Sequence, residues 1–363
     1  MKIVADENIL FVEDYFQGDI LRKPGRSIVQ HDLIDADILL IRSVTKVNSA
    51  LLSNTSVKFV GSVTAGFDHV DVDWLNKAGI QWSITKGSNA IAVVEYVICV
   101  IAALQKMHFL MQKKPRAAVI GVGNIGAHVA EKLKILGFEV VLCDPFREDI
   151  VTTPFEELVD LDFISLHTPL TTQGAYPTYH LIQRDFLSRQ KKDCVLLNAG
   201  RGEVICFDDL KLYGQSLLWC LDVWEKEPYI DLEILKLAVI ATPHIAGYSV
   251  QSKYRGIEMI YQAALREKMI IPHANVAPVY PTQTISFEYT KTHWRDVVLR
   301  IFDPMMTSQH MKKTVVENAD AFDYLRKTFP ARHEFAYVQL QDLILSEDDR
   351  SLLKNLGFFL KSK

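Results

Sequence analysis

Short apolar runs alternate with longer amphipathic segments over the first 93 residues of the chain. Four of these runs have the length and composition of buried strands, at residues 2–5, 38–42, 59–62 and 80–84. Segments of helical length separate them, and this alternation is typical of a parallel sheet covered by helices. We therefore predict a small parallel α/β unit in this part of the chain.

A second series of apolar runs follows a long apolar segment at residues 90–107, which we predict to be a buried helix. Glu95 interrupts that segment, which is too short to span a bilayer. A helix over residues 249–269 could return the chain to the first unit. The six strand-like runs between these helices fit a doubly wound sheet, at residues 117–121, 139–144, 163–167, 194–198, 218–222 and 239–242.

The last part of the chain has a different pattern. Pro272, Pro278 and Pro281 punctuate a predicted linker. Beyond the linker we predict helices at residues 294–302 and 321–329 and an apolar strand at residues 334–340. The whole pattern predicts an α/β protein with two Rossmann-like, doubly wound parallel-sheet domains and a small C-terminal α+β domain.

A glycine-rich turn near residue 120 has the pattern of a phosphate-binding loop. Gly121 permits a tight turn, Gly123 lets the backbone approach a pyrophosphate, and Gly126 lets helix and strand pack closely. A helix over residues 125–136 would present its N-terminal amides to the anion. Asp144 ends the next strand, 21 positions after Gly123, where it could bind the ribose hydroxyls. We predict a dinucleotide site, with a glycine-rich turn of another α/β protein as the alternative.

The acid at position 144 also bears on the choice of cofactor. Its charge would repel the 2′-phosphate of NADP, so the sequence favours NAD. Arg147 follows three residues later, and an arginine near this position can accept a 2′-phosphate. We prefer to interpret Arg147 as a solvated surface charge.

Composition and charge limit the classes of partner. The 363 residues are 49% hydrophobic and 23% charged, with a formal net charge of −4, so neither nucleic acid nor an anionic membrane is an expected partner. The five cysteines are odd in number and lack metal-ligand spacing. We expect reduced thiols and no metal ion. Because the N-terminus begins with a strand pattern and not a signal peptide, we expect a cytoplasmic protein.

Three titratable side chains follow predicted strands of the second unit. Arg201 stands in a turn of small residues, where its forked guanidinium could hold a carboxylate. Glu227 follows the next strand, and His244, a natural proton carrier near neutral pH, follows the last one. Each has a structural alternative: an arginine paired with an acid, a helix-capping acid, or a buried histidine. Their occurrence together favours catalysis.

These groups supply what the oxidation of a 2-hydroxy acid needs. Arg201 would anchor the carboxylate, and His244 would take the hydroxyl proton as hydride leaves for a nicotinamide. Glu227 would stabilise the imidazolium. Asp222 could orient the nicotinamide amide, and Thr168 is a predicted cofactor contact beside a structural His167.

Five motifs, in this order, resemble those of the D-isomer-specific 2-hydroxyacid dehydrogenases. The resemblance covers residues 1 to about 270 and implies that Arg201, Glu227 and His244 are a catalytic trio that works with NAD. The motifs that carry it begin at Gly121, His167, Asn198, Asp222 and Pro243.

The same resemblance implies the domain boundaries. Residues 1–93 and 252–276 would form a discontinuous substrate-binding domain, and residues 94–251 the NAD-binding domain. Residues 277–363 resemble a dimerisation domain, so a homodimer is expected.

Three further features of the sequence are residues 42–47 with 64–66, residues 89–97, and a C-terminal extension containing residues 322–329 and 332–335. In these features the chain resembles a branch of the family that oxidises a phosphorylated 2-hydroxy acid in pyridoxal phosphate biosynthesis. The branch implies substrate contacts from Ser43, Thr64 and Tyr248. A phosphate also needs positive charge, for which Arg42 is our candidate substrate contact. Lys46 and Lys86 lie in loops of the same unit, and solvated surface charge remains the alternative for all three bases. The resemblance and the glycine pattern together predict these NAD contacts: Gly121, Gly123, Asn124, Ile125, Gly126, Asp144, Thr168, Ala199, Gly200, Arg201, Asp222 and Gly247.

Some residues depart from the family pattern, and other functions stay open. Gly200 stands where a side chain often precedes the arginine, and Cys206 stands where an aspartate is usual. These departures concern loop geometry more than the reaction. The alternatives are a dehydrogenase of glycerate, lactate or 3-phosphoglycerate, or a non-catalytic protein that senses NAD(H).

Overall fold

The structure is a computed structural model that describes residues 1–272, 280–318 and 320–360. The chain divides into two compact units. Met1–Asn89 and Tyr248–Pro281 form the first unit, and Ala90–Gly247 and Thr282–Lys363 form the second. Pro278 of the predicted linker lies outside the described residues.

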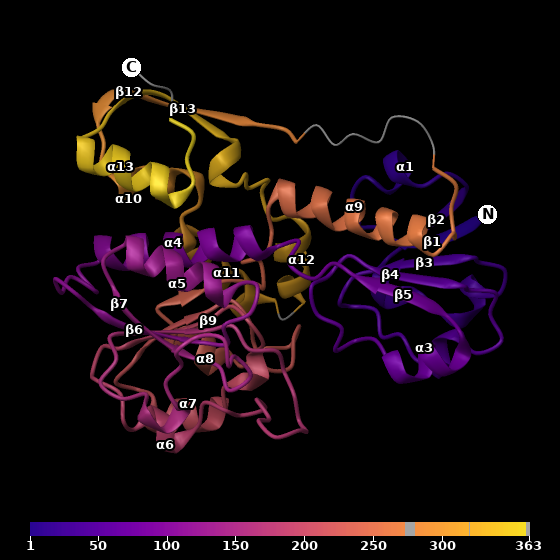
Figure 1. Cartoon of the computed structure of the whole chain (residues 1–363), viewed down its shortest axis with the longest axis horizontal. Coiled ribbons are helices and arrows are strands. Elements are labelled where there is room, and N and C mark those ends of the chain that lie inside the picture. The colour runs from indigo at the N-terminus through magenta and orange to yellow at the C-terminus, as the bar shows by residue number, and fades with distance from the viewer. Residues whose placement is uncertain (273–279, 319, 361–363) are drawn as a thin grey trace. The chain divides into compact units, whose positions relative to one another are not determined.

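The first unit is built on a five-stranded parallel sheet in the order β2-β1-β3-β4-β5 (Figure 1). Four strands confirm the four predicted apolar runs to within one residue. The strand β2 was not predicted; it pairs with β1 at the edge of the sheet, where most of its residues are partly exposed. The strands are β1 Lys2–Asp6, β2 Asp19–Lys23, β3 Ile38–Ile41, β4 Phe59–Ser62 and β5 Gln81–Ile84.

Successive residues of this sheet face opposite hydrophobic clusters. Ile3 belongs to the cluster that includes Ile257 and Ile260 of helix α9 (Val250–Arg266). Val4 belongs to the other cluster, which includes Leu75 of helix α3 (Val72–Ala78). The helix predicted to return to the first unit is therefore confirmed as α9. The described residues of this unit also contain the short helices α1 Val12–Tyr15 and α2 Ser49–Leu52.

The second unit contains a six-stranded parallel sheet in the order β11-β10-β9-β8-β6-β7. All six predicted strands are confirmed. The strand order reverses between β6 and β8, and ligands bind beyond the carboxyl ends of the strands at such a point. The strands are β6 Arg116–Ile120, β7 Glu139–Cys143, β8 Phe163–Leu166, β9 Val195–Asn198, β10 Leu218–Leu221 and β11 Ile240–Ala241.

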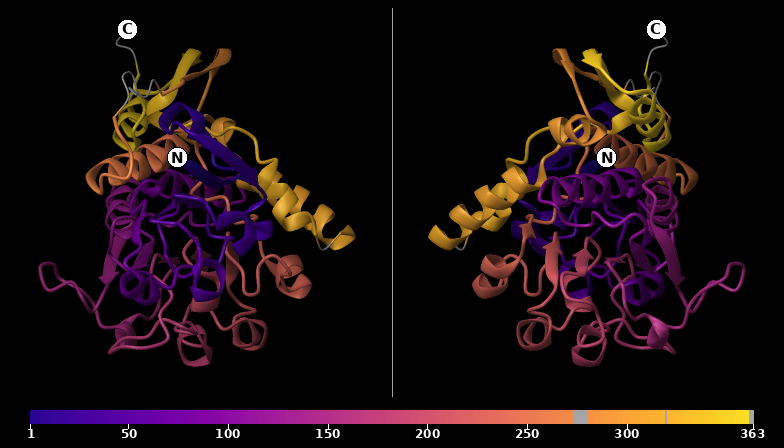
Figure 2. Two further views of the ribbon diagram at one scale, coloured as in Figure 1. Left: turned by 90° about the vertical axis from the view of Figure 1, so that its right-hand side faces the viewer. Right: turned by 90° about the vertical axis from the view of Figure 1, so that its left-hand side faces the viewer.

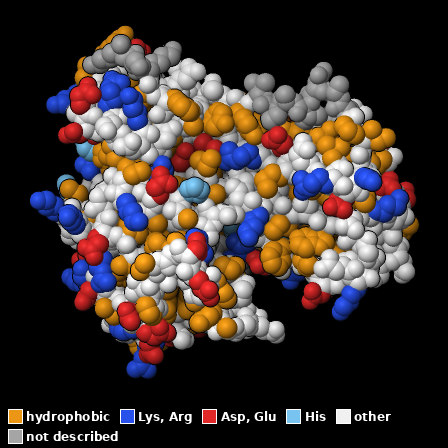
Figure 3. Space-filling model, viewed as in Figure 1, with side chains coloured by type: hydrophobic (Ala, Val, Ile, Leu, Met, Phe, Trp, Pro, Cys, Tyr) orange, Lys and Arg blue, Asp and Glu red, His pale blue; other side chains and the backbone are white. Residues whose placement is uncertain are grey.

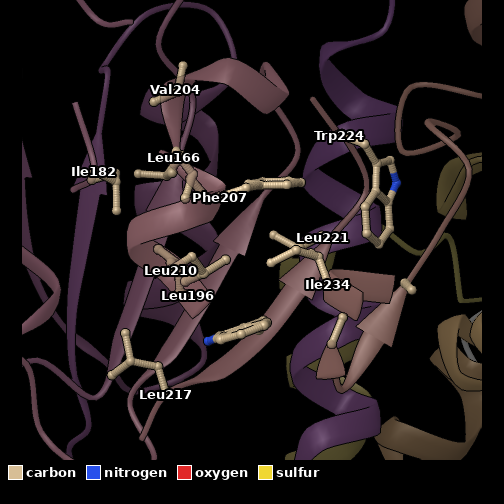
Figure 4. Close-up of a cluster of buried hydrophobic side chains, with 14 of the residues drawn as sticks. Leu166, Ile182, Leu196, Val204, Phe207, Leu210, Leu217, Leu221, Trp224 and Ile234 are labelled. Carbon is tan, nitrogen blue, oxygen red and sulfur yellow. The ribbon is translucent and has the colours of Figure 1, made fainter. Parts of the chain in front are cut away.

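Helices cover both faces of this second sheet. Helices α4 (Ala90–Lys106) and α5 (Gly126–Ile135) lie on one face, and α6 (Arg184–Leu187) and α7 (Phe207–Tyr213) lie on the other (Figure 1). Helix α8 (Leu232–Leu237) adds Ile234 to the core of that second face. The buried side chains there come from strands, helices and loops together (Figure 4), and include Leu166, Leu196, Phe207, Leu210 and Leu221.

In its described residues, the C-terminal segment adds a parallel pair of strands and four α-helices. Its predicted helices are confirmed as α10 and α12. The strand predicted at residues 334–340 begins four residues later than expected, at Val338. Phe335–Tyr337 form a 3₁₀ turn because the Phe335 amide donates a hydrogen bond to Glu95 of α4, at 2.8 Å. The elements are β12 Gln283–Lys291, α10 Trp294–Ile301, α11 Pro304–Glu317, α12 Ala321–Lys327, β13 Val338–Ile344 and α13 Glu347–Leu356.

Helix α11 covers the open edge of the six-stranded sheet. The Ala241 amide of β11 donates to the Ser308 hydroxyl at 2.9 Å, and the Lys312 ammonium donates to the Ala238 carbonyl. Met311 and Val315 are buried in the hydrophobic cluster drawn in part in Figure 4. The side views show α11 and α12 in yellow-orange, one beside the other (Figure 2). The helix thus shields a sheet edge that would otherwise be open to pairing with another strand. The separate third domain expected over residues 277–363 stays a prediction.

Charges of both signs are interspersed over the face drawn in space-filling form (Figure 3). Surface ion pairs include Arg22 with Glu13 at 2.8 Å and Lys106 with Asp296 at 2.7 Å. The five cysteines carry free thiols. Among the described residues, no helix has the length and apolar character needed to cross a membrane.

Candidate active site

The glycine-rich turn lies between β6 and α5, as predicted. Gly121 has a φ of +87°, which side-chain-bearing residues rarely adopt. A Cβ atom at Gly126 would lie 1.9 Å from the Gly121 carbonyl oxygen, so helix and turn meet only because both residues are glycine.

Gly123 and Thr168 have features that a bound dinucleotide would explain. A Cβ atom at Gly123 would contact nothing within 4 Å, so protein packing does not explain the glycine, whereas a pyrophosphate close to the backbone would. Thr168 follows β8 across the point where the strand order reverses, and its buried hydroxyl has no hydrogen-bond partner among the described residues. A bound NAD would give that hydroxyl a partner.

Asp144 follows β7 and shapes the same turn. Its Oδ2 accepts the Val122 amide at 2.8 Å and its Oδ1 accepts the Phe146 amide at 3.0 Å. Arg147 forms a two-pronged ion pair with Asp149, at 2.7 and 2.8 Å. The Arg147 Nη1 also donates to the Val122 carbonyl of the turn at 2.6 Å, and the interpretation of Arg147 as a solvated surface charge stays a prediction.

We expect Asp144→Asn to weaken NADH binding and to narrow the preference for NADH over NADPH. The amide keeps an acceptor for the Val122 amide but loses the charge that repels a 2′-phosphate. Titration of protein fluorescence with each nucleotide measures the ratio of dissociation constants. An unchanged ratio would mean that Asp144 does not face the ribose.

The Arg201 turn is built by buried Asn198 at the end of β9. The Asn198 side chain accepts the Gly200 amide at 3.0 Å and donates to the Arg201 carbonyl at 2.8 Å. A Cβ atom at Gly202 would lie 2.1 Å from the backbone of Trp224. This close approach fixes the Arg201 turn against the loop that carries Glu227.

Glu227 and His244 are in direct contact. The Glu227 Oε2 lies 2.8 Å from the His244 Nδ1, and the Glu227 Oε1 accepts the Trp224 amide at 3.0 Å. Burial tends to raise the pKa of Glu227, but the charge and hydrogen bond of His244 hold that pKa below its usual range. Glu227 is therefore anionic near neutral pH and can stabilise an imidazolium.

Asp222 supports the loop that contains His244. His244 has a φ of +55°, in the left-handed region that few side-chain-bearing residues adopt. The buried Asp222 carboxylate accepts the amides of Ile245 at 2.8 Å and Ala246 at 2.9 Å, and the Thr242 hydroxyl at 2.6 Å. Burial raises the pKa of Asp222. These bonds hold the backbone on both sides of His244.

His167 has the surroundings of a structural residue. Its Nε2 lies 2.8 Å from the Ser165 hydroxyl, and burial lowers the pKa of His167 to about 3. The imidazole is therefore neutral at physiological pH, which agrees with the structural interpretation.

Two arginines of the C-terminal segment were missed by sequence reasoning. The Arg332 Nη2 donates to the carbonyls of Ala246 at 2.6 Å and Ala92 at 3.0 Å. The charge of Arg326 on α12 also lowers the pKa of Glu227. Both side chains are at least nine-tenths buried, and a buried charge is costly unless it is compensated. No local motif marks either residue, because their partners are distant in sequence.

We expect Arg326→Met to move the acidic limb of the pH–rate profile to higher pH. Removing the positive charge raises the pKa of Glu227. This side chain then loses its negative charge at a higher pH, and it no longer stabilises the imidazolium that forms at His244 during the reaction. Profiles of kcat/KM measure the shift. Arg326→Lys should restore the limb, and an unchanged limb in Arg326→Met would contradict the coupling.

The predicted substrate contacts belong to the first unit. Arg42 and Ser43 follow β3, and the Arg42 Nε is 3.0 Å from the buried Asp6 carboxylate. Thr64 follows β4 and donates to the Gly66 carbonyl at 3.1 Å. Tyr248 immediately precedes the N-cap of α9. These side chains thus come from the carboxyl ends of strands and from the start of a helix.

The other predicted cofactor contacts lie in loops of the second unit. Asn124 and Ile125 belong to the turn before α5, Ala199 and Gly200 to the turn after β9, and Gly247 to the loop after β11. Within residues 1–272, 280–318 and 320–360, no cluster of three or more His, Cys, Asp or Glu side chains could hold a metal ion.

The departure at Cys206 has a local structural consequence. Cys206 occupies the N-cap of α7, and its side chain makes no capping hydrogen bond. The Phe207 amide donates instead to the Glu225 Oε1, at 3.3 Å. A neighbouring loop therefore binds the first free amide of the helix, which differs from the second- or third-residue amide that an N-cap aspartate would bind.

Comparison with known families matches both parts of the chain. Residues 102–246 match the NAD-binding domain of the D-isomer specific 2-hydroxyacid dehydrogenases. Residues 271–357 match a family described only as a domain of unknown function. The first match includes the glycine turn, Arg201, Glu227 and His244.

Full-length relatives are more specific. The erythronate-4-phosphate dehydrogenase of Coxiella burnetii (strain RSA 331) is 44% identical over 349 residues, which cover 94% of this chain and 95% of the relative. The chain belongs to the erythronate-4-phosphate dehydrogenase family. Another member, from Cellvibrio japonicus, is 38% identical and is covered over 99% of both chains.

Solved structures support the fold of the family. A D-lactate dehydrogenase from Aquifex aeolicus, complexed with NAD and lactic acid, has a TM-score of 0.62 at 24% identity. An NAD-dependent formate dehydrogenase from Staphylococcus aureus has a TM-score of 0.62 at 23% identity. Each match covers 74% of this chain and 96% of the other one. The chain is an NAD-dependent oxidoreductase of the 2-hydroxyacid dehydrogenase type.

Proposed function

We propose that this chain oxidises 4-phospho-D-erythronate with NAD to 2-oxo-3-hydroxy-4-phosphobutanoate, a step of pyridoxal 5′-phosphate biosynthesis. The hydrogen-bonded pair of Glu227 and His244, in the unit that holds the dinucleotide turn, carries the proposal chemically. The full-length likeness to erythronate-4-phosphate dehydrogenases supports the substrate.

Each member of the trio has one task in the reaction. Arg201 binds the substrate carboxylate through its guanidinium fork. Because the His244 Nδ1 is bonded to Glu227, the Nε2 is the atom that accepts the proton of the C2 hydroxyl. Glu227 stabilises the imidazolium that results. Bound NAD supplies the hydride acceptor.

The remaining site residues follow from the same proposal. Ser43, Thr64, Tyr248 and Arg42 bind the substrate. Asp222 positions the loop of His244, and its predicted contact with the nicotinamide amide remains part of the proposal. The other NAD contacts are Gly121, Gly123, Asn124, Ile125, Gly126, Asp144, Thr168, Ala199, Gly200, Arg201 and Gly247.

NADH formation at near-stoichiometric enzyme, with a carbonyl trap, tests the proposed function. The trap is needed because oxidation of a hydroxy acid is unfavourable near neutral pH. A burst with 4-phospho-D-erythronate and not with D-glycerate, D-lactate or 3-phosphoglycerate is the expected result. A burst with another acid alone would remove the substrate assignment, and no burst with any of them would favour an NAD(H)-sensing protein.

The assembly state and the location are part of the same proposal. The chain forms a homodimer through its C-terminal segment and works in the cytoplasm. Strand β12 supports the dimer as an exposed edge open to pairing, because six of its nine residues are exposed, Tyr289 among them at 73%. Analytical ultracentrifugation should give twice the chain mass, and a monomer at micromolar concentration would contradict the dimer.

A further inference from the structure

An arginine with unused donors lies at the carboxyl edge of the first sheet. The Arg42 Nε is 3.0 Å from the Asp6 Oδ2, whose carboxylate is fully buried at the end of β1. Apart from this bond, the Arg42 guanidinium makes no hydrogen bond within the described part of the chain. Its terminal nitrogens are therefore held in place and still available to a ligand.

A lysine without an acidic partner among the described residues belongs to the same unit as this arginine, and the charge of Arg42 acts on it. Lys253 belongs to the first turn of α9, and its Nζ is 5.4 Å from the centre of the Tyr248 ring. The Lys253 ammonium forms no hydrogen bond or ion pair with any described residue. Its side chain is exposed, so an anion could reach it.

The electrostatic surroundings of Lys253 are unfavourable to its own charge. Desolvation, and then the nearby charge of Arg42, lower the pKa of Lys253. The positive end of the α9 dipole adds to this repulsion, and the first turn of α9 contains no acidic residue. A bound anion would offset the repulsion between these positive charges, because it is attracted by both cations and by the helix end.

We propose that Lys253 and Arg42 form the binding site for the 4-phosphate of the substrate. The ligand is a phosphate monoester dianion, which accepts charge-assisted hydrogen bonds from the Lys253 ammonium and from the free edge of Arg42. Ser43, next to Arg42, adds an exposed hydroxyl. The site rests on the proposed function, since it explains how the chain selects a phosphorylated acid.

Paired kinetics with 4-phospho-D-erythronate and unphosphorylated D-erythronate test this site. Lys253→Met should lower kcat/KM for the phosphorylated acid by about 10- to 150-fold, which corresponds to the loss of one hydrogen bond to a charged group. The same variant should lower kcat/KM for D-erythronate much less. Arg42→Lys keeps a cation beside the buried Asp6 but removes the forked guanidinium. It should therefore also lower kcat/KM for the phosphorylated acid. Lys77→Met, on the distant helix α3, is the charge-matched control.

Inorganic phosphate gives a readout that does not depend on turnover. Calorimetric titration of the full-length wild type should show binding that Lys253→Met weakens at least tenfold and Lys77→Met leaves unchanged. Equal losses with both acids, or unchanged phosphate affinity in Lys253→Met, would overturn the site. If the wild-type enzyme showed no preference for the phosphorylated acid, the proposed function would be contradicted. The phosphate titration would then still show whether Lys253 binds phosphate.

Discussion

Replacement of His244 by asparagine should lower kcat by about 10²- to 10⁴-fold, the usual contribution of a general acid–base residue, while NADH still binds. The imidazole is the group held by Glu227 at 2.8 Å, so its loss removes the proton acceptor. Asparagine is the suitable replacement because it tolerates the positive φ of this position better than most residues.

Two measurements separate chemistry from structure in this variant. Fluorescence titration should give an NADH dissociation constant within about twofold of the wild type, and single-turnover kinetics should show the slow step. Loss of NADH binding would count against the catalytic assignment, because it would mean that the substitution had deformed the loop. The parallel variant His167→Asn tests a buried histidine outside the proposed chemistry and should retain much of its turnover.

Arg201→Met should lower kcat/KM by about 10²- to 10⁴-fold, since it removes two charge-assisted hydrogen bonds to the substrate carboxylate. Asn198 and Gly202 hold the turn through backbone contacts, so the fold should survive the change. Steady-state kinetics over a range of acid concentrations measure the loss. Arg201→Lys, which keeps charge without the fork, should recover only part of it.

A fall in kcat/KM of less than about fivefold in Arg201→Met would contradict carboxylate binding. Equal thermal stability of wild type and variant is the control for folding. If the oxoacid product also binds through its carboxylate, its affinity should fall in proportion.

The sequence was sufficient to predict both parallel sheets because their strands are buried on both faces. Val4 and its neighbours, Ile3 and Ala5, face different hydrophobic clusters, so the strand is a continuous apolar run. The phosphate-binding turn was predictable for another reason. Backbone geometry at Gly121 and close packing at Gly126 leave no choice of residue.

Elements with mixed exposure could not be predicted in the same way. Strand β2 lies at a sheet edge and β12 is mostly exposed, so neither has an apolar run. Helix α11 has a weak amphipathic pattern, and its position on β11 depends on contacts such as Ser308 with Ala241, 67 residues apart. Arg326 and Arg332 were missed for the same reason, since only tertiary structure brings a distant cation to a catalytic loop.

The return of the chain through α9 has a consequence for synthesis on the ribosome. The hydrophobic cluster around Ile3 and Phe59 is completed by Ile257 and Ile260, which are made only after the whole stretch Ala90–Gly247 of the second unit. At the usual speed of translation, the first sheet would wait roughly ten seconds or more with one apolar face uncovered. The first sheet therefore finishes folding only after α9 has been made, and this nascent sheet is a natural client for a chaperone.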